Sequence, residues 1–99
     1  MHPSTNIQPL VAIVLCTYNG EKYLRPQLDS ILSQSWQALE IIICDDGSTD
    51  STPSILQEYQ QKDQRIRYQI NARNLGYNKN FEQAFQMAKA DYIAISDQD

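Results

Sequence analysis

Two continuous runs of apolar, mostly β-branched residues constrain the fold of this chain more than any other feature. Residues 10–16 (LVAIVLC) and residues 39–44 (LEIIIC) contain a single charged side chain between them, Glu40. Such runs are typical of strands that are buried on both faces, as strands inside a parallel sheet are. We therefore expect two interior strands that end at residues 17 and 45.

Amphipathic stretches separate the predicted strands. Apolar residues recur at helical spacing over residues 24–32, 55–59 and 81–88, which predicts three helices. Pro26 is expected in the first turn of the first helix, where the missing amide of proline costs nothing. The second helix is expected to begin at Asp50, Ser51 or Thr52 as N-cap, with Pro53 just inside.

Strands and helices alternate along the whole chain, which predicts an α/β fold with a parallel sheet and right-handed crossovers. The first strand is the most apolar and should be central, so the predicted strand order is 3-2-1-4. The third strand alternates apolar and polar residues, as an edge strand does. The strands are expected near residues 10–17, 40–45, 66–71 and 91–96, in one domain over residues 10–99 that follows a loose arm at residues 1–9.

Composition narrows the classes of partner. The 99 residues suffice for one small domain, and 41% hydrophobic and 20% charged residues are ordinary for a globular protein. The net charge of −4 argues against nucleic acid or an anionic membrane as partner. The sequence shows neither a secretion signal nor an apolar run that could span a bilayer, so we expect a protein that works in the cytoplasm or at the inner face of the membrane.

Cys16 and Cys44 each lie at the end of an apolar run and lack metal-ligand spacing. Reduced, buried thiols are the expected state, because free cysteine packs as a small apolar residue and cytosolic thiols stay reduced. If the two strands are neighbours, a disulfide between the two cysteines remains an alternative.

Polar clusters follow three of the predicted strands: TYN at residues 17–19, DDGSTD at 45–50 and SDQD at 96–99. The carboxyl ends of parallel strands meet at one edge of the sheet, where open α/β sheets bind their ligands. Asp46-Gly47 also suits a plain surface turn. Asp45 is less well explained in that way, and acidic residues after a second strand accept hydrogen bonds from ribose hydroxyls in dinucleotide-binding folds.

Asp97 and Asp99 are separated by one residue, a spacing that puts both carboxylates on one face of an extended segment. Their mutual repulsion is relieved by a hard divalent cation, which can also bridge to a diphosphate. A solvated acidic loop is the alternative.

Residues 10–99 resemble the family 2 glycosyltransferases. The resemblance rests on four segments in order: VAIVLCTYNGEKYL, EIIICDDGSTDST, NLGYNKN and DYIAISDQD. These enzymes have the Rossmann-like GT-A fold and transfer a sugar with inversion from a nucleotide diphosphate sugar, here a UDP- or dTDP-sugar. SDQD and TYNGEKYL look most like the rhamnosyltransferase-type enzymes of bacterial polysaccharide synthesis.

The resemblance implies roles for particular residues. Asp46 matches the carboxylate that contacts the base, with Asp45 beside it. Asp97 and Asp99 match the Asp-x-Asp motif: the second aspartate coordinates Mn or Mg, and the first reaches the ribose or the metal. The segment that holds the nucleobase and ribose corresponds to Cys16, Thr17, Tyr18 and Asn19.

The chain departs from the family pattern in one place. Many members carry an Arg-Asn pair in the helix after the Asn-x-Gly loop, where this chain has Phe81 and Glu82. Lys79, one turn earlier, is the candidate substitute for the pyrophosphate contact, and a solvated lysine is the alternative.

The family's acceptor-binding half and catalytic base lie beyond the Asp-x-Asp motif, so the resemblance implies a donor-binding fragment that meets its glycan or glycolipid acceptor through the other half. Competing interpretations are a nucleotide-sugar-binding module without transfer activity, a haloacid-dehalogenase-like phosphatase and a phosphoacceptor receiver domain. The phosphatase needs its aspartates after the first strand. The receiver domain needs an acidic pair there and a lysine after its last strand.

Overall fold

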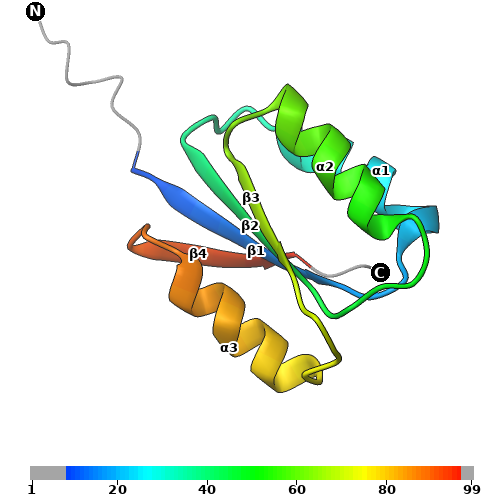
Figure 1. Cartoon of the computed structure of the whole chain (residues 1–99). Helices are drawn as coiled ribbons and strands as arrows, with labels where there is room; N and C mark the ends of the chain where they lie inside the picture. The colour runs from blue at the N-terminus through cyan, green and yellow to red at the C-terminus, as the bar shows by residue number, and fades with distance from the viewer. Residues whose placement is uncertain (1–8, 97–99) are drawn as a thin grey trace, which may run out of the picture.

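The computed structural model describes residues 9–96, and within them a four-stranded sheet is flanked by three helices (Figure 1). All three strand pairs are parallel and the strand order is β3-β2-β1-β4, which confirms the predicted fold and places β1 inside the sheet. The elements are β1 (Val11–Thr17), α1 (Glu21–Leu32), β2 (Leu39–Asp45), α2 (Thr52–Lys62), β3 (Ile66–Ile70), α3 (Tyr77–Met87) and β4 (Tyr92–Ser96).

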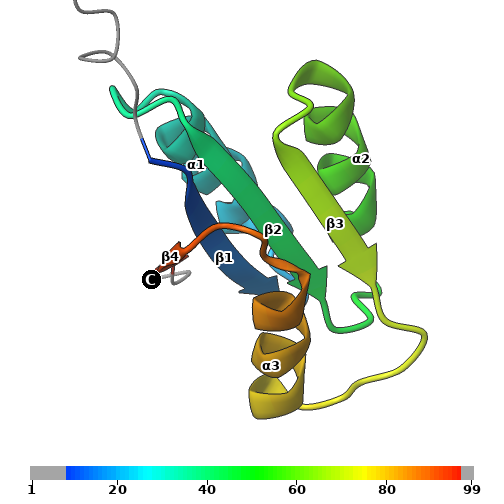
Figure 2. The same cartoon turned by 90° about the vertical axis from the view of Figure 1, so that its left-hand side faces the viewer.

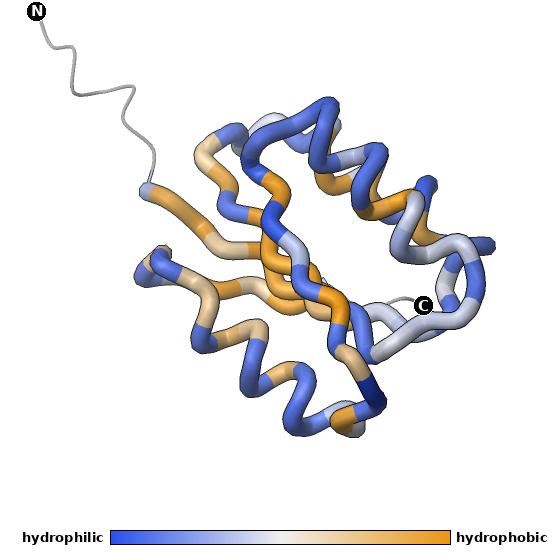
Figure 3. Tube along the Cα trace, in the orientation of Figure 1, coloured by the Kyte–Doolittle hydropathy of each residue, from blue (hydrophilic) through white to orange (hydrophobic). Residues whose placement is uncertain are grey.

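The sheet is covered on both faces, by α1 and α2 on one side and by α3 on the other (Figures 1 and 2). Hydrophobic residues are concentrated in the central strands and on the inner sides of the helices (Figure 3). Every residue of β2 is buried, which explains why the strand is apolar except for the hydrogen-bonded carboxylates Glu40 and Asp45. None of the described helices has the length and apolar character needed to cross a membrane.

β4 is an edge strand with little cover. Tyr92 on one face of the sheet is 61% exposed, and Ile93 and Ile95 on the other face are 41% and 55% exposed. Within residues 9–96, β4 pairs with β1 alone, so its other edge presents free backbone groups.

The prediction that Pro26 lies in the first turn of α1 was wrong. The helix begins at Glu21, so Pro26 lies inside it on an exposed side. The earlier start is stabilised from a distance, because the Gly20 amide donates to Thr52 Oγ1 at 3.0 Å and the Glu21 amide to Asp50 Oδ2 at 3.2 Å. No local pattern could reveal these capping partners.

The α2 prediction was confirmed: Ser51 is the N-cap, Thr52 is the first helical residue and Pro53 the second. The α3 prediction was partly wrong, since Phe85 is 38% exposed and Ala88 lies just beyond the helix end.

Both cysteines are free thiols, as expected, and directly opposite each other in the β1–β2 register. Cys44 is buried, but the prediction was wrong for Cys16, which is only partly buried. Cys16 is one of the partly buried residues packed against the apolar cluster that includes Cys44 and Phe81.

A buried carboxylate fastens the α3–β4 connection to the sheet. Glu40 in β2 is 8% exposed and accepts hydrogen bonds from the amides of Lys89 and Ala90 at 2.9–3.0 Å. Arg67 in β3 donates to Glu40 Oε1 and to the Met87 carbonyl, each at 2.6 Å. Burial raises the pKa of Glu40, but these charge-stabilising hydrogen bonds outweigh it, so the net pKa lies below its ordinary value.

Glu40→Gln should lower the free energy of unfolding at pH 7 by about 2–3 kcal/mol, because it breaks a buried, hydrogen-bonded ion pair. Glu40 is deprotonated in the folded state at neutral pH, and its contribution is lost as pH falls through its lowered folded pKa. The deficit of the variant, measured by urea denaturation, should therefore shrink below pH 4.5. Exposed Glu82→Gln is the control and should change stability by less than about 0.5 kcal/mol; an equal loss in both variants would contradict the assignment.

Candidate functional site

Asp45, the last residue of β2, is fully buried at the carboxyl edge of the sheet. Its Oδ1 accepts hydrogen bonds from Thr17 Oγ1 and Ser48 Oγ, each at 2.6 Å, and its Oδ2 accepts one from the Ser48 amide at 2.8 Å. The carboxylate therefore joins the end of β1 to the loop that follows β2.

The loops after β1 and β2 are further joined through Asn19, whose φ of 49° places it in the left-handed region that asparagine tolerates. The backbone amide of Asn19 donates to Ser48 Oγ at 2.7 Å, and its side-chain Oδ1 accepts a hydrogen bond from the Thr49 backbone amide at 2.8 Å. Glu21 Oε1 accepts from the Ser51 amide at 2.8 Å. Both loops are thus held in one conformation by contacts between side chains and backbone.

Asp46 faces the other way and holds the loop between β3 and α3. Its Oδ1 accepts from Asn71 Nδ2 at 3.0 Å and from the Leu75 amide at 2.7 Å, and its Oδ2 accepts from the Gly76 amide at 3.1 Å. Asn74 Nδ2 donates to the Asp46 carbonyl. Burial raises the pKa of Asp46, but the hydrogen bonds from Leu75, Asn71 and Gly76 outweigh it and lower the pKa.

Buried amide side chains support this loop from below. Asn71 and Asn80 are 8% and 2% exposed, and Asn71 Nδ2 also donates to Asn80 Oδ1 at 2.8 Å. Asn80 Nδ2 donates to the Cys44 carbonyl at 2.9 Å, and Gln83 Nε2 donates to Asn71 Oδ1 at 2.9 Å. Gly47, at φ 81°, lies where an added Cβ would be 3.4 Å from the Asn71 carbonyl oxygen. The loop after β2 and the loop after β3 are therefore closely packed.

The predicted site residues have different surroundings. Thr17, Asn19, Asp45 and Asp46 come together at the carboxyl edge of the sheet, directly or through Ser48. Tyr18 is 50% exposed beside them. Cys16 belongs to the face that α3 covers. Lys79 lies exposed in the first turn of α3.

The predicted metal ligands, Asp97 and Asp99, lie outside the described residues, so their positions stay a prediction. Between residues 9 and 96, no three histidine, cysteine or carboxylate side chains are grouped as a metal site.

Four residues of this edge were not predicted from the sequence: Ser48, Asn71 and Asn80, which hold Asp45 and Asp46 in place, and the cation Arg73. Arg73 is exposed on the loop that Asp46 anchors, and it forms no ion pair within the part of the chain that the structure describes. The asparagine-rich segment NARNLGYNKN was the available signal, since asparagine side chains satisfy loop backbone groups.

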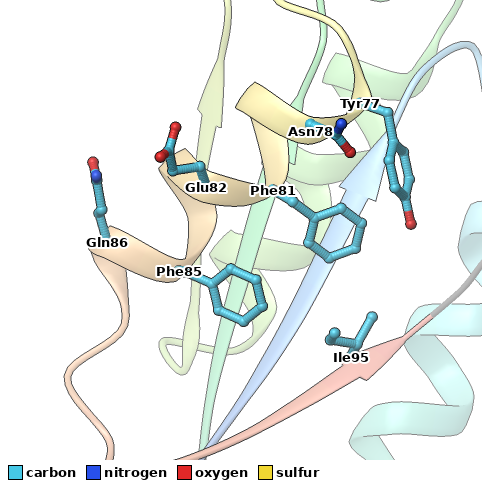
Figure 4. A pocket seen from close by; sticks show the side chains of 7 residues that line it. All are labelled: Tyr77, Asn78, Phe81, Glu82, Phe85, Gln86 and Ile95. Carbon is cyan, nitrogen blue, oxygen red and sulfur yellow. The ribbon is translucent and has the colours of Figure 1, made fainter.

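An apolar groove of about 510 Å³ lies between α3 and β4, and neither Asp45 nor Asp46 lines it (Figure 4). Phe81, Phe85 and Ile95 point toward one another across it, with Tyr77 at one end. Such a lining suits apolar side chains and offers little to an anionic ligand.

Residues 12–99 match the family model described as Glycosyl transferase family 2, so the chain belongs to this family. An uncharacterized glycosyltransferase, MJ1057, from Methanocaldococcus jannaschii is 42% identical over 94 residues. The match covers 93% of this chain and 32% of that protein, so the chain spans about a third of that relative's length.

Solved glycosyltransferase structures share the fold. S. aureus TarS 1-349 superimposes with a TM-score of 0.83 at 28% identity, covering 91% of this chain and 27% of TarS, and has also been solved with UDP and with UDP-GlcNAc. The mannosyltransferase PcManGT from Pyrobaculum calidifontis, solved with GDP-Man and Mn2+, gives a TM-score of 0.85 at 24% identity, covering 95% of this chain and 28% of that protein. The chain therefore has the GT-A fold.

Asp46→Asn should release the loop over residues 71–76, because an amide cannot replace both carboxylate oxygens as acceptors. The amide hydrogens of Leu75 and Gly76 should exchange about tenfold faster, since a hydrogen bond to a charged acceptor contributes about 1.5–3 kcal/mol. Hydrogen exchange measured by NMR checks this, with exposed Asp91→Asn as control. Unchanged protection of both amides in Asp46→Asn would show that other contacts hold the loop.

Proposed function

We propose that this chain binds the nucleotide sugar donor for an inverting family 2 glycosyltransferase of polysaccharide or glycolipid synthesis. The supporting observation is the joined set of Thr17, Asn19, Asp45 and Asp46 at the carboxyl edge of a GT-A sheet. The complexes of TarS with UDP and UDP-GlcNAc support a UDP-sugar. Family membership disfavours the phosphatase and receiver-domain alternatives.

In this proposal Asp45 is a positioning residue. Its carboxylate is fully buried and already accepts three hydrogen bonds, so it acts on the ligand through Thr17 and Ser48. It fixes the ends of β1 and β2 and so shapes the segment from Cys16 to Asn19 that would hold the base and ribose. The exposed ring of Tyr18 offers a stacking surface.

Asp46 would contact the base directly. Its Oδ2 accepts a single described hydrogen bond, from the Gly76 amide, which leaves acceptor capacity for one more donor. The ring N–H of uracil or thymine supplies such a donor, whereas the corresponding ring nitrogen of cytosine is an acceptor and would be repelled. Asp46 would thereby favour a UDP- or dTDP-sugar over a cytidine nucleotide sugar.

The diphosphate carries the remaining charge to be neutralised. Lys79 and Arg73 are exposed cations near this edge and would approach the phosphates from α3 and its preceding loop. Asp97 and Asp99 supply the hard oxygen ligands that Mn or Mg prefers, and two carboxylates leave positions for diphosphate oxygens and water. The cation, when bound, would stabilise the negative charge of the departing nucleoside diphosphate.

Binding of UDP and dTDP, measured by titration calorimetry with Mn and with a chelator, tests these roles. Asp46→Asn should weaken binding about tenfold in both conditions, because a hydrogen bond to a charged group is lost. Asp99→Asn should weaken only the Mn-dependent part, and Asp91→Asn should change neither. If Asp46→Asn and Asp99→Asn both bind like the unchanged chain, the site assignment is wrong.

We further propose that transfer requires protein beyond this chain. The chain spans 32% of MJ1057 and 27% of TarS 1-349. Among the described residues, 9–96, none has a proposed role as catalytic base or acceptor contact. The free edge of β4 and the apolar groove beside it are the surfaces that additional protein would cover.

The purified 99-residue chain should therefore bind the nucleotide but transfer no sugar. Incubation with UDP- and dTDP-sugars, Mn and glycan or glycolipid acceptors, followed by mass spectrometry of the acceptor, checks this. A glycosylated product from this chain alone would refute the proposal.

A further inference from the structure

Three sulfur atoms are grouped beneath the candidate site, on the face of the sheet that α3 covers. Cys16 and Cys44 are directly paired in the parallel register of β1 and β2, so their side chains leave the same face. The Cys44 thiol donates to Met87 Sδ at 3.6 Å, and all three residues belong to the apolar cluster between the sheet and α3. Nothing in the nucleotide-binding proposal uses Cys44 or Met87.

The spacing of the two strands suits an ion held between thiolates. Neighbouring strands lie about 4.8 Å apart. A metal–thiolate bond is about 2.3 Å long, so two sulfurs on opposite sides of one ion lie about 4.6 Å apart. A thioether lies at the side of this pair, because Met87 Sδ is 3.6 Å from Cys44 Sγ.

The ligand types select the class of ion. Thiolate and thioether sulfur prefer soft cations, whereas Mg and Mn prefer oxygen. Within residues 9–96 no third cysteine, histidine or carboxylate joins the pair as a metal-binding group. Cys16 is partly exposed, which gives an ion access to the buried Cys44.

We propose that Cys16, Cys44 and Met87 form a binding site for one soft monovalent cation, Cu(I) or its analogue Ag(I). The site is separate from the Mn or Mg site expected at Asp97 and Asp99. On binding, each thiol loses its proton to solvent, two metal–thiolate bonds form, and no electron is transferred. Two protons are released for each ion bound.

The surroundings keep the site protonated until an ion arrives. Burial, Cys44 and the nearby Asp46 carboxylate together raise the pKa of Cys16 to about 12, and burial raises the pKa of Cys44. The Asp46 carboxylate, the smallest of the three causes at Cys16, opposes a free thiolate by its negative charge and for the same reason favours a bound cation.

Anaerobic titration of Cu(I) against a chromophoric Cu(I) chelator tests the site. One ion should bind per chain, with release of two protons in weak buffer. Cys16→Ser and Cys44→Ser should each weaken binding by about 100-fold or more, and Met87→Leu, which keeps the apolar volume, by about tenfold. Excess Mn should not displace the Cu(I) ion.

A control separates this site from ordinary thiol binding. Ser30→Cys in the Cys16→Ser, Cys44→Ser background carries one cysteine on the exposed side of α1, and it should bind Cu(I) no better than Cys16→Ser does. The proposal is overturned if Cys16→Ser binds Cu(I) within threefold of the unchanged chain, or if two ions bind independently. Cys16→Ser changes a partly exposed position, so the test does not depend on Cys44→Ser folding, and it requires no nucleotide.

Discussion

The buried carboxylate of Asp45 is the contact on which the organisation of the carboxyl edge depends. It accepts a hydrogen bond from the Thr17 hydroxyl at the end of β1. It also accepts hydrogen bonds from the hydroxyl and the backbone amide of Ser48 in the loop after β2. A fully buried charge is costly unless it is hydrogen-bonded, and here both carboxylate oxygens are. The arrangement therefore holds only when β1, β2 and Ser48 are all in place, which makes the geometry of this edge cooperative.

Asp46 likewise accepts hydrogen bonds that hold a loop, in this case the loop after β3. Because consecutive residues at a strand end point in opposite directions, Asp45 and Asp46 fasten different loops: the loops after β1 and β2 in one case, and the loop after β3 in the other. Two adjacent carboxylates thus connect three strand ends. Beneath them, the amide side chains of Asn71 and Asn80 satisfy buried polar groups that would otherwise be exposed to an apolar core.

The sheet was predictable in detail because each strand and helix is marked by a pattern of consecutive residues in the sequence. Strands buried on both faces require uninterrupted apolar runs, and alternation with helical stripes leaves a parallel sheet as the consistent solution. The prediction that placed Pro26 in the first turn of α1 was wrong, because groups distant in sequence determine where that helix begins. α1 begins at Glu21 because Asp50 and Thr52 cap it from another loop.

The sequence by itself determined that Thr17, Asn19, Asp45 and Asp46 meet at one edge, because parallel strands bring their carboxyl ends together whatever the side chains do. Only the tertiary structure decided what each one touches. Asp45 and Asp46 are adjacent in sequence and chemically identical, yet the first is fully buried against Thr17 and the second holds Leu75 and Gly76. Thr17, Leu75 and Gly76 lie 28 to 30 residues from the carboxylates that they contact, and such contacts exist only after the chain has folded.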